Sequence, residues 1–244
     1  MPLNAGVLLI GSLYWEDDPT RNNWRNSRLE LGNQYSVSAP IRYGRLSSSR
    51  GNTYTMIFSR LCLRRSHGLG TAKAISLKYQ IETPSQLIRE AEYLWTAEQH
   101  QKQPNACISA CWGCVALLAN PASQIPQDLL DWWKERIAQE TNFGKLNHTK
   151  SEERCITSTG FLNIPWPRLY EDDSPLPMDI LLATATNPTL SDDSASYPRI
   201  KEIARAWRQS TIRNEEYFWR NYESGIRTYQ DGAILKILKQ RRIA

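Results

Sequence analysis

The first stretch of this 244-residue chain that could do chemistry is a Gly-Ser turn at the end of an apolar run. The segment Gly6–Leu13 reads GVLLIGSL, which predicts a short buried strand that ends at Gly11-Ser12. Glycine lets the backbone bend there and approach a ligand closely, and the N–H groups that follow can form a nest for an anion. The alternative is an ordinary turn that ends a strand, and the dipeptide alone does not separate the two.

Three of the five cysteines form a second candidate, with the spacing C-x3-C-x2-C at Cys107, Cys111 and Cys114. Radical S-adenosylmethionine enzymes use this spacing to hold a [4Fe–4S] cluster, because three thiolates can bind three irons. That motif normally begins a large α/β barrel, and too little chain follows Cys114 to build one. Zinc would need a fourth ligand. The cysteines lie in an apolar run, where Cys behaves as a small hydrophobe, so we expect buried thiols and no metal site.

Basic residues are concentrated in the first third of the chain. Residues 1–75 contain ten Lys and Arg, nine of them Arg, against four acids, whereas the remainder is close to neutral. An Arg-rich field suits carboxylates and phosphates, although a solvated basic face without a partner is an equal alternative. Nucleic acid is not the expected partner, since acidic residues accompany the aromatic and basic residues of the C-terminal part.

Composition and motifs exclude several classes of protein. A hydrophobic content of 41% is too high for a disordered chain. No run approaches the roughly 18 apolar residues that a membrane span needs, and the first ten residues lack the features of a signal peptide. An odd number of cysteines without an export signal predicts reduced thiols and a cytoplasmic location. The motifs G-x-S-x-G, G-x-x-x-x-G-K-[ST] and G-x-G-x-x-G are absent from the sequence.

The elements that must position these groups follow from periodicity and turn residues. Strands are expected near residues 6–13, 35–46, 53–58, 71–81 and 112–118. A helix is expected to begin at Pro84, with Thr83 as its N-cap. After residue 120 we expect a helix at 126–139, a buried strand at 178–186 and helices from residue 199 onward. Because strands prevail before residue 120 and helices after it, the predicted class is α+β.

The order of these segments, together with the Gly-Ser turn, is similar to that of one known family. The chain has a strand that runs into Ile10-Gly11-Ser12-Leu13, and then a polar segment with Trp24 and Arg25. Strands at APIRYGRL and NTYTMIF and a helix with Leu87 and several glutamates follow. This order resembles the γ-glutamylcyclotransferase-like family, whose first strand runs into Tyr-Gly-Ser-Leu, with Ile10 in place of the Tyr. The similarity covers residues 5–120. It implies a small mixed β-barrel domain over residues 1–120, followed by a mostly helical extension over residues 121–244.

The resemblance also implies a reaction and a ligand. In that family the loop equivalent to Ile10, Gly11, Ser12 and Leu13 holds a γ-glutamyl group, and a glutamate moves a proton from the substrate amine to the leaving amine. The products are 5-oxoproline and a free amine, and no metal or organic cofactor is needed. The expected partner is a small anionic γ-glutamyl-type substrate, and self-association as a homodimer is a further expectation. The candidates for holding a substrate carboxylate are Arg25, Arg42 and Arg45.

The glutamate is where this sequence departs from the family pattern. Counting seven residues from Leu87 reaches Leu94 rather than an acid, and the nearby candidates are Glu90, Glu92 and Glu98. Glu90 and Glu98 share a helical face with Leu94, so a shift of one turn would give the role to Glu98. If all three carboxylates face solvent, the alternative is a non-catalytic binding or interaction module on the same fold.

Overall fold

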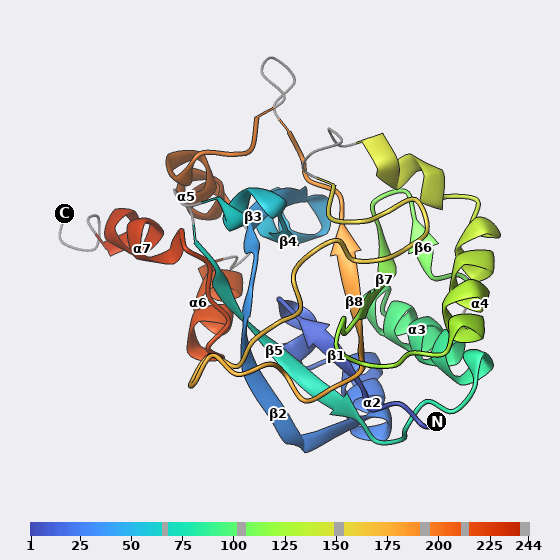
Figure 1. The fold of residues 1–244 in the computed structure, drawn as a ribbon. Helices are drawn as coiled ribbons and strands as arrows, with labels where there is room; N and C mark the ends of the chain where they lie inside the picture. The colour runs from blue at the N-terminus through green and yellow to red at the C-terminus, as the bar shows by residue number, and fades with distance from the viewer. Residues whose placement is uncertain (65–67, 102–105, 149–153, 191–195, 211–214, 240–244) are drawn as a thin grey trace.

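The fold was analysed in a computed structural model, which describes residues 1–64, 68–101, 106–148, 154–190, 196–210 and 215–239. These residues form a mixed α+β structure with two sheets and helices on opposite sides of the molecule (Figure 1). The strands are β1 (Ala5–Leu9), β2 (Leu29–Ala39), β3 (Ile41–Ser47), β4 (Thr53–Phe58), β5 (Gly70–Leu77), β6 (Ser109–Ala110), β7 (Gly113–Ala119) and β8 (Ile180–Thr186). The α-helices are α1 (Ser12–Trp15), α2 (Pro19–Arg28), α3 (Pro84–Glu98), α4 (Gln127–Ala138), α5 (Ile200–Gln209), α6 (Glu215–Glu223) and α7 (Asp231–Lys239).

The main sheet has six strands in the order β2-β5-β1-β8-β7-β6, and β3 pairs with β4 in a separate sheet. The strand order has two ends, so the described strands form open sheets and not the closed barrel that the resemblance implies. β1 is antiparallel to β5 and parallel to β8, with Val7 opposite Leu182. The α+β class is confirmed, and the central strands β1 and β8 pair a strand near the N-terminus with one from the second half of the chain.

Strand β8 ties the second half of the chain into the sheet. It lies between β1 and β7 and pairs with β7 over seven residues, from Gly113 opposite Thr186 to Ala119 opposite Ile180. The expected helices after residue 120 are present as α4 to α7, but residues 121–244 also supply this central strand. Hydrogen bonds within one sheet therefore join residues on both sides of the boundary expected at residue 120.

Helix α3 begins as its sequence predicts. The Thr83 hydroxyl accepts a hydrogen bond from the Gln86 N–H (3.3 Å), the Gln86 side chain accepts one from the Thr83 N–H (3.0 Å), and Pro84 takes the first helical position. This is a capping box, which satisfies free N–H groups at the start of a helix. Leu94 and Trp95 are fully buried, so the face of α3 that the family pattern would give to an acid packs into the core instead.

Aromatic side chains of α5 and α6 pack against the two-stranded sheet of β3 and β4. Trp207 of α5 packs edge-on against Tyr43 of β3, with ring centroids 4.7 Å apart, and Phe218 of α6 lies 5.2 Å from Trp207. All three rings are buried. Tyr217 and Phe218 of α6 are therefore part of the core, whereas Trp219 and Tyr222 are partly buried against it. None of the helices in the described ranges is long and apolar enough to cross a membrane.

The prediction that the three clustered cysteines are buried is confirmed for Cys114 and wrong for Cys107 and Cys111. Cys114 lies on β7 and is fully buried, which raises the pKa of its thiol. Cys107 and Cys111 are exposed, because Cys107 precedes β6 and Cys111 lies in the turn that joins β6 to β7. The described residues contain no group of three or more His, Cys, Asp or Glu side chains that could hold a metal ion.

Candidate functional site

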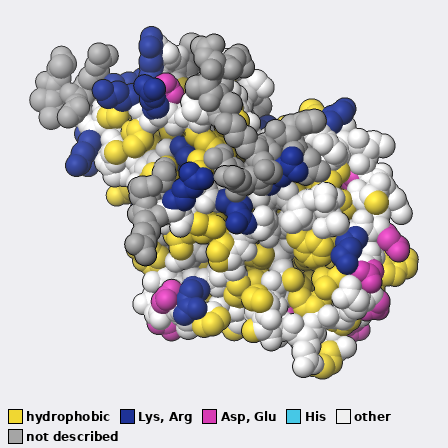
Figure 2. Space-filling model, turned by 45° about the horizontal axis from the view of Figure 1, so that its top comes forward, with side chains coloured by type: hydrophobic (Ala, Val, Ile, Leu, Met, Phe, Trp, Pro, Cys, Tyr) yellow, Lys and Arg dark blue, Asp and Glu magenta, His cyan; other side chains and the backbone are white. Residues whose placement is uncertain are grey.

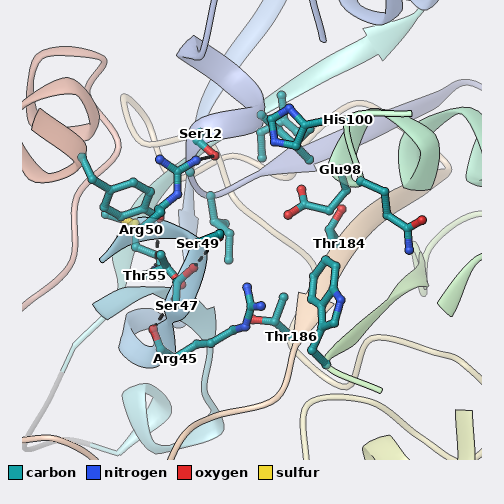
Figure 3. Close-up of a pocket in the computed structure, with 18 of the residues that line it drawn as sticks. Ser12, Arg45, Ser47, Ser49, Arg50, Thr55, Glu98, His100, Thr184 and Thr186 are labelled. Atoms are coloured by element: carbon teal, nitrogen blue, oxygen red, sulfur yellow. Dashed lines mark hydrogen bonds between the residues drawn. The ribbon is translucent and has the colours of Figure 1, made fainter. Parts of the chain in front are cut away.

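A cavity of about 510 Å³ lies where the turn after β1, the end of α3, the β3–β4 hairpin and the end of β8 meet (Figure 3). Its volume is typical of a site for a small molecule. Most of its side chains are polar. They include Ser12, Arg21, Arg45, Ser47, Ser49, Arg50, Thr55, Glu98, His100, Thr184, Thr186 and Tyr217, with Trp112 and apolar side chains of β1 completing the lining.

The turn after β1 comes close to a buried tyrosine, and this explains its glycine. A Cβ atom at Gly11 would lie only 2.8 Å from the hydroxyl oxygen of Tyr217 on α6. That hydroxyl accepts a hydrogen bond from the Met56 N–H at 3.2 Å, so it is held in place. Burial raises the pKa of Tyr217. The backbone at Gly11–Leu13 therefore packs directly on a fixed polar group, with room for a glycine alone.

Arg21 connects this turn to the end of α3. The guanidinium is 2% exposed, and it donates to the Ser12 hydroxyl (2.9 Å) and, through Nε, to the Ala97 carbonyl (3.3 Å). Ala97 directly precedes Glu98. One arginine thus fixes the spacing between the Gly-Ser turn and the residue that the sequence proposes as its acid.

The Glu16 carboxylate neutralises the two arginines beside the Gly-Ser turn. Glu16 forms ion pairs with Arg21 and, at 2.7 Å, with Arg50, which also donates to the Ser12 hydroxyl at 2.9 Å. Burial acts to raise the pKa of Glu16, but Arg21 and Arg50 together lower it below its usual range. We call this side of the cavity the loop wall; it consists of Gly11–Leu13, Arg21 and Arg50, with Glu16 behind them.

Glu98 is the last residue of α3, and its carboxyl group points into the cavity (Figure 3). Burial raises its pKa above the ordinary value of a glutamic acid, while Arg21, Arg45 and Arg50 act in the opposite direction. Such a group holds a proton more readily than a surface glutamate and still lies in a cationic field. A raised pKa of this kind is a feature of carboxyl groups that act as general acids and bases.

The opposite side of the cavity consists of Arg45, Trp112, Thr184 and Thr186, and we call it the β8 wall. The Arg45 guanidinium lies 4.5 Å from the centroid of the Trp112 ring, which stacks on Trp95 at 4.9 Å. Figure 3 shows Arg45 extending toward Thr186. The hydroxyl oxygens of Thr184 and Thr186 are buried and have no hydrogen-bond partner among the described residues.

His100 lies at the rim of the cavity in an unusual backbone conformation. Its φ is +55°, in the left-handed region that a non-glycine residue seldom adopts. Its Nδ1 atom lies 3.5 Å from a carboxylate oxygen of Asp18, the residue that caps α2 by accepting from the Thr20 and Arg21 N–H groups. The imidazole is therefore held beside the loop wall.

The structure brings together some of the residues that the sequence singles out. The cavity is lined by Ile10, Gly11, Ser12, Leu13, Arg45 and Glu98. Glu90 instead forms an ion pair with Arg28, and Glu92 lies 4.0 Å from Arg136 of α4. These two carboxylates belong to contacts between elements and are not among the lining residues.

The other two candidate arginines also lie outside the cavity lining. Arg25 donates to the carbonyls of Leu13 (2.6 Å) and Glu16 (2.7 Å), so it supports the turn from behind. Arg42 is buried on β3 with its guanidinium 4.3 Å from the ring centroid of Tyr197. Neither guanidinium lines the cavity in which Glu98 lies.

Several site residues carry no local signal in the sequence. Arg21 and Arg50 belong to the basic first third, but nothing in their neighbours distinguishes them from the other arginines there. Thr184 and Thr186 read as part of an ordinary buried strand. They reach the cavity only because β8 pairs with β1, which is a contact between distant parts of the chain.

Lys and Arg side chains lie in separate groups on the face shown in Figure 2, with uncharged side chains between the groups that can be seen. The chain matches no protein-family model, and neither a curated protein nor a solved structure is significantly similar to it. Function must therefore be argued from the cavity itself. It places a carboxyl group with a raised pKa among guanidinium and hydroxyl groups, a setting that suits a small anionic ligand.

Proposed function

We propose that this protein is a γ-glutamylcyclotransferase-like enzyme that releases 5-oxoproline and a free amine from a γ-glutamyl amide. The observation that carries the proposal is that Glu98 and the Gly11–Leu13 turn line the same cavity. The raised pKa of Glu98 supports its role as acid and base. The expected setting is the cytoplasm, with no membrane or nucleic-acid partner.

In the proposed reaction the α-amine of the glutamyl group attacks its own γ-carbonyl carbon. Glu98 accepts a proton from this amine and delivers it to the leaving nitrogen, and the bond between the γ-carbon and that nitrogen breaks. The Tyr14 N–H is bonded to the Gly11 carbonyl at 3.0 Å, so the Ser12 and Leu13 N–H groups are the ones proposed to stabilise the developing oxyanion. The ring of 5-oxoproline closes as the free amine leaves, and Glu98 returns to its starting state.

Two features of the chain differ from the family pattern and shape the proposal. Ile10 stands where the family has a tyrosine, and the acid lies one helical turn later than expected, since Leu94 is buried in the core. The described strands form open sheets, so the barrel of the family remains an expectation. Arg21, through Ser12 and Ala97, supports the shifted position because it ties the end of α3 to the turn.

The test is the release of 5-oxoproline from a panel of γ-glutamyl amines by the purified protein. Removal of a general acid and base lowers rates by about 10²- to 10⁴-fold, so Glu98→Gln should lose activity by that factor. Glu92→Gln is the matched control, because Glu92 lies on the same helix outside the cavity lining, and it should keep the wild-type rate. Equal, null signals from wild type and Glu98→Gln would contradict the proposal and favour a binding module without turnover.

A further inference from the structure

Arg42 of β3 is a buried cation that lies outside the cavity of Glu98. The residue is 6% exposed, and its Nε atom is buried without a hydrogen-bond partner among the described residues. Within the described ranges no acidic side chain forms an ion pair with it. Burial of a guanidinium costs free energy unless an anion or hydrogen-bond acceptors replace the lost water. Arg42 therefore has bonding capacity that the described part of the chain does not use.

Two titratable groups are near enough to interact with the charge of Arg42, and neither is an anion at neutral pH. Burial raises the pKa of the Cys62 thiol to about 11, although Arg42 acts in the opposite direction. Burial also raises the pKa of Tyr229, again against the effect of Arg42. Both groups keep their protons near neutral pH, so neither of them neutralises the guanidinium.

Two tyrosine rings lie against this guanidinium. The Arg42 Cζ atom lies 4.3 Å from the centroid of the Tyr197 ring and 6.0 Å from that of the Tyr229 ring. A ring face attracts a guanidinium, but this contact leaves the N–H groups at the edge of the guanidinium able to donate. A planar fork of N–H donors matches two oxygens of an oxyanion. The rings therefore orient the guanidinium and leave its hydrogen-bond donors for another partner.

The surrounding backbone holds these side chains in place without a ligand. A Cβ atom at Gly44 would lie 3.5 Å from the Tyr197 ring, so this ring packs against β3. The Tyr43 N–H donates to the side-chain oxygen of Gln230 at 2.9 Å, which ties β3 to the residue after Tyr229. Tyr197 stands shortly before α5 and Tyr229 shortly before α7, and α5 lies beside β3 in Figure 1. A site that is already formed loses less free energy to ordering when a ligand binds.

We propose that Arg42, with Tyr197 and Tyr229 against its guanidinium, is a binding site for a compact oxyanion such as inorganic phosphate. The anion would accept hydrogen bonds at the edge of the guanidinium and supply the missing counter-charge. This site is separate from the cavity of Glu98, so the inference does not depend on the proposed function. Because β3 and the segments before α5 and α7 meet here, a bound anion would stabilise the packing of both helices on the small sheet.

The test is a titration of the purified protein with inorganic phosphate at constant ionic strength, followed by calorimetry. Hydrogen bonds between charged groups are stronger than those between neutral ones, so Arg42→Gln should weaken phosphate binding at least about tenfold. Arg42→Lys should also weaken it, because an ammonium group lacks the planar fork. Arg168→Gln, which removes an exposed arginine elsewhere, is the control and should bind as the wild type does. Binding that is lost in Arg45→Gln and kept in Arg42→Gln would assign phosphate to the Glu98 cavity and overturn the inference.

Melting temperatures separate a binding role of Arg42 from a structural one. A ligand that binds only the folded protein raises the melting temperature as its concentration rises, so phosphate should stabilise the wild type. In phosphate-free buffer Arg42→Met should melt at the wild-type temperature or above it, because an apolar side chain often replaces a buried charge without loss of stability. Phosphate should then have no effect on Arg42→Met. A destabilised Arg42→Met that responds to phosphate as the wild type does would overturn the inference.

Two further comparisons identify the occupant of the site. Asp192 and Asp193 precede Tyr197 in the sequence and lie outside the described residues. Phosphate binding that is absent from the wild type and appears in Asp192→Asn/Asp193→Asn would show that the chain's own carboxylates pair with Arg42, and would overturn the inference. Binding of glycerol 3-phosphate as tightly as inorganic phosphate supports a site for the phosphate group of a larger ligand, whereas binding of inorganic phosphate alone supports a site for the free ion. Binding of neither ligand overturns the inference.

Discussion

The two walls of the cavity satisfy their polar groups in different ways. On the loop wall, Arg21 and Arg50 are paired with Glu16 and hydrogen-bonded to Ser12. On the β8 wall, Arg45 lies against an aromatic ring, and the hydroxyls of Thr184 and Thr186 have no partner in the described part of the chain. Paired groups hold a backbone in position, whereas unpaired groups are left for a ligand.

This difference between the walls indicates how one side of a site can be held rigid while polar groups on the other side stay able to bind a ligand. Charge-assisted bonds among Ser12, Glu16, Arg21 and Arg50 fix the turn at a set distance from the end of α3, which gives Glu98 a defined place. The β8 wall is held by sheet hydrogen bonds instead, so its side chains need not support the backbone. We therefore expect substitutions on the loop wall to change mainly stability, and substitutions on the β8 wall to change mainly ligand binding.

The largest effect on stability should come from Glu16→Gln. This change leaves Arg21, which is almost fully buried, and Arg50 without their shared carboxylate, and we expect the free energy of unfolding to fall by about 1–3 kcal/mol. Urea denaturation measures the change. Glu216→Gln is the matched control, since it removes an exposed pair with Arg220 and should cost less than about 1 kcal/mol. Equal effects of the two variants would show that the loop wall is not held by this pair.

Gly11→Ala should have the next largest effect. The added methyl group would lie against the Tyr217 hydroxyl, and such overpacking typically costs about 1–3 kcal/mol. The same change in a Tyr217→Phe background should cost less, because the atom that the methyl group meets is gone. Thermal denaturation of the four proteins in this cycle gives the coupling between the two sites. Additive effects would contradict the contact.

Thr184→Val and Thr186→Val should change stability in the opposite direction. Each replaces a buried hydroxyl that lacks a partner with a methyl group of similar shape, so each should stabilise the fold by about 1 kcal/mol while weakening ligand binding. Thr53→Val is the control, because the Thr53 hydroxyl donates to the Arg50 carbonyl at 2.8 Å and its loss should destabilise the protein. If all three variants destabilise the protein alike, the β8 hydroxyls are part of the framework.

The smallest effect concerns pH. Arg45 lowers the pKa of Glu98, while burial, the larger influence, raises it. In Arg45→Gln the pKa of Glu98 should therefore rise further, and the acidic limb of kcat/KM, which needs the ionised base, should move to higher pH. The stability of this variant should stay close to that of wild type, because Arg45 makes no ion pair within the described ranges. A shift toward lower pH would contradict the placement of Arg45 near Glu98.

Local sequence signals predict the loop wall better than the β8 wall. The Gly-Ser turn follows from an apolar run that ends in glycine, and the start of α3 follows from Thr83 and Pro84, whose capping bonds involve neighbouring residues. Helical spacing also places Glu98 one turn after Leu94, on the same face of α3. Each of these features depends on residues close together in the chain.

Other features depend on contacts between distant residues and have no local signal. The pairing of Val7 with Leu182 brings Thr184 and Thr186 to the cavity, and a strand pattern does not reveal its neighbour in a sheet. The expectation of buried thiols is wrong for Cys107 and Cys111, since an apolar run does not show where a hairpin turns. The contacts of Arg25 and Arg42 also have no local signal, because both are made with residues that are not their neighbours in the chain.

The most direct test of the division between the walls is a crystal structure of the Glu98→Gln variant with γ-glutamylglycine. We expect the γ-carbonyl beside the Gly11–Leu13 turn and the amide nitrogen within hydrogen-bonding distance of residue 98. A ligand bound in the reverse direction, or outside this cavity, would contradict it.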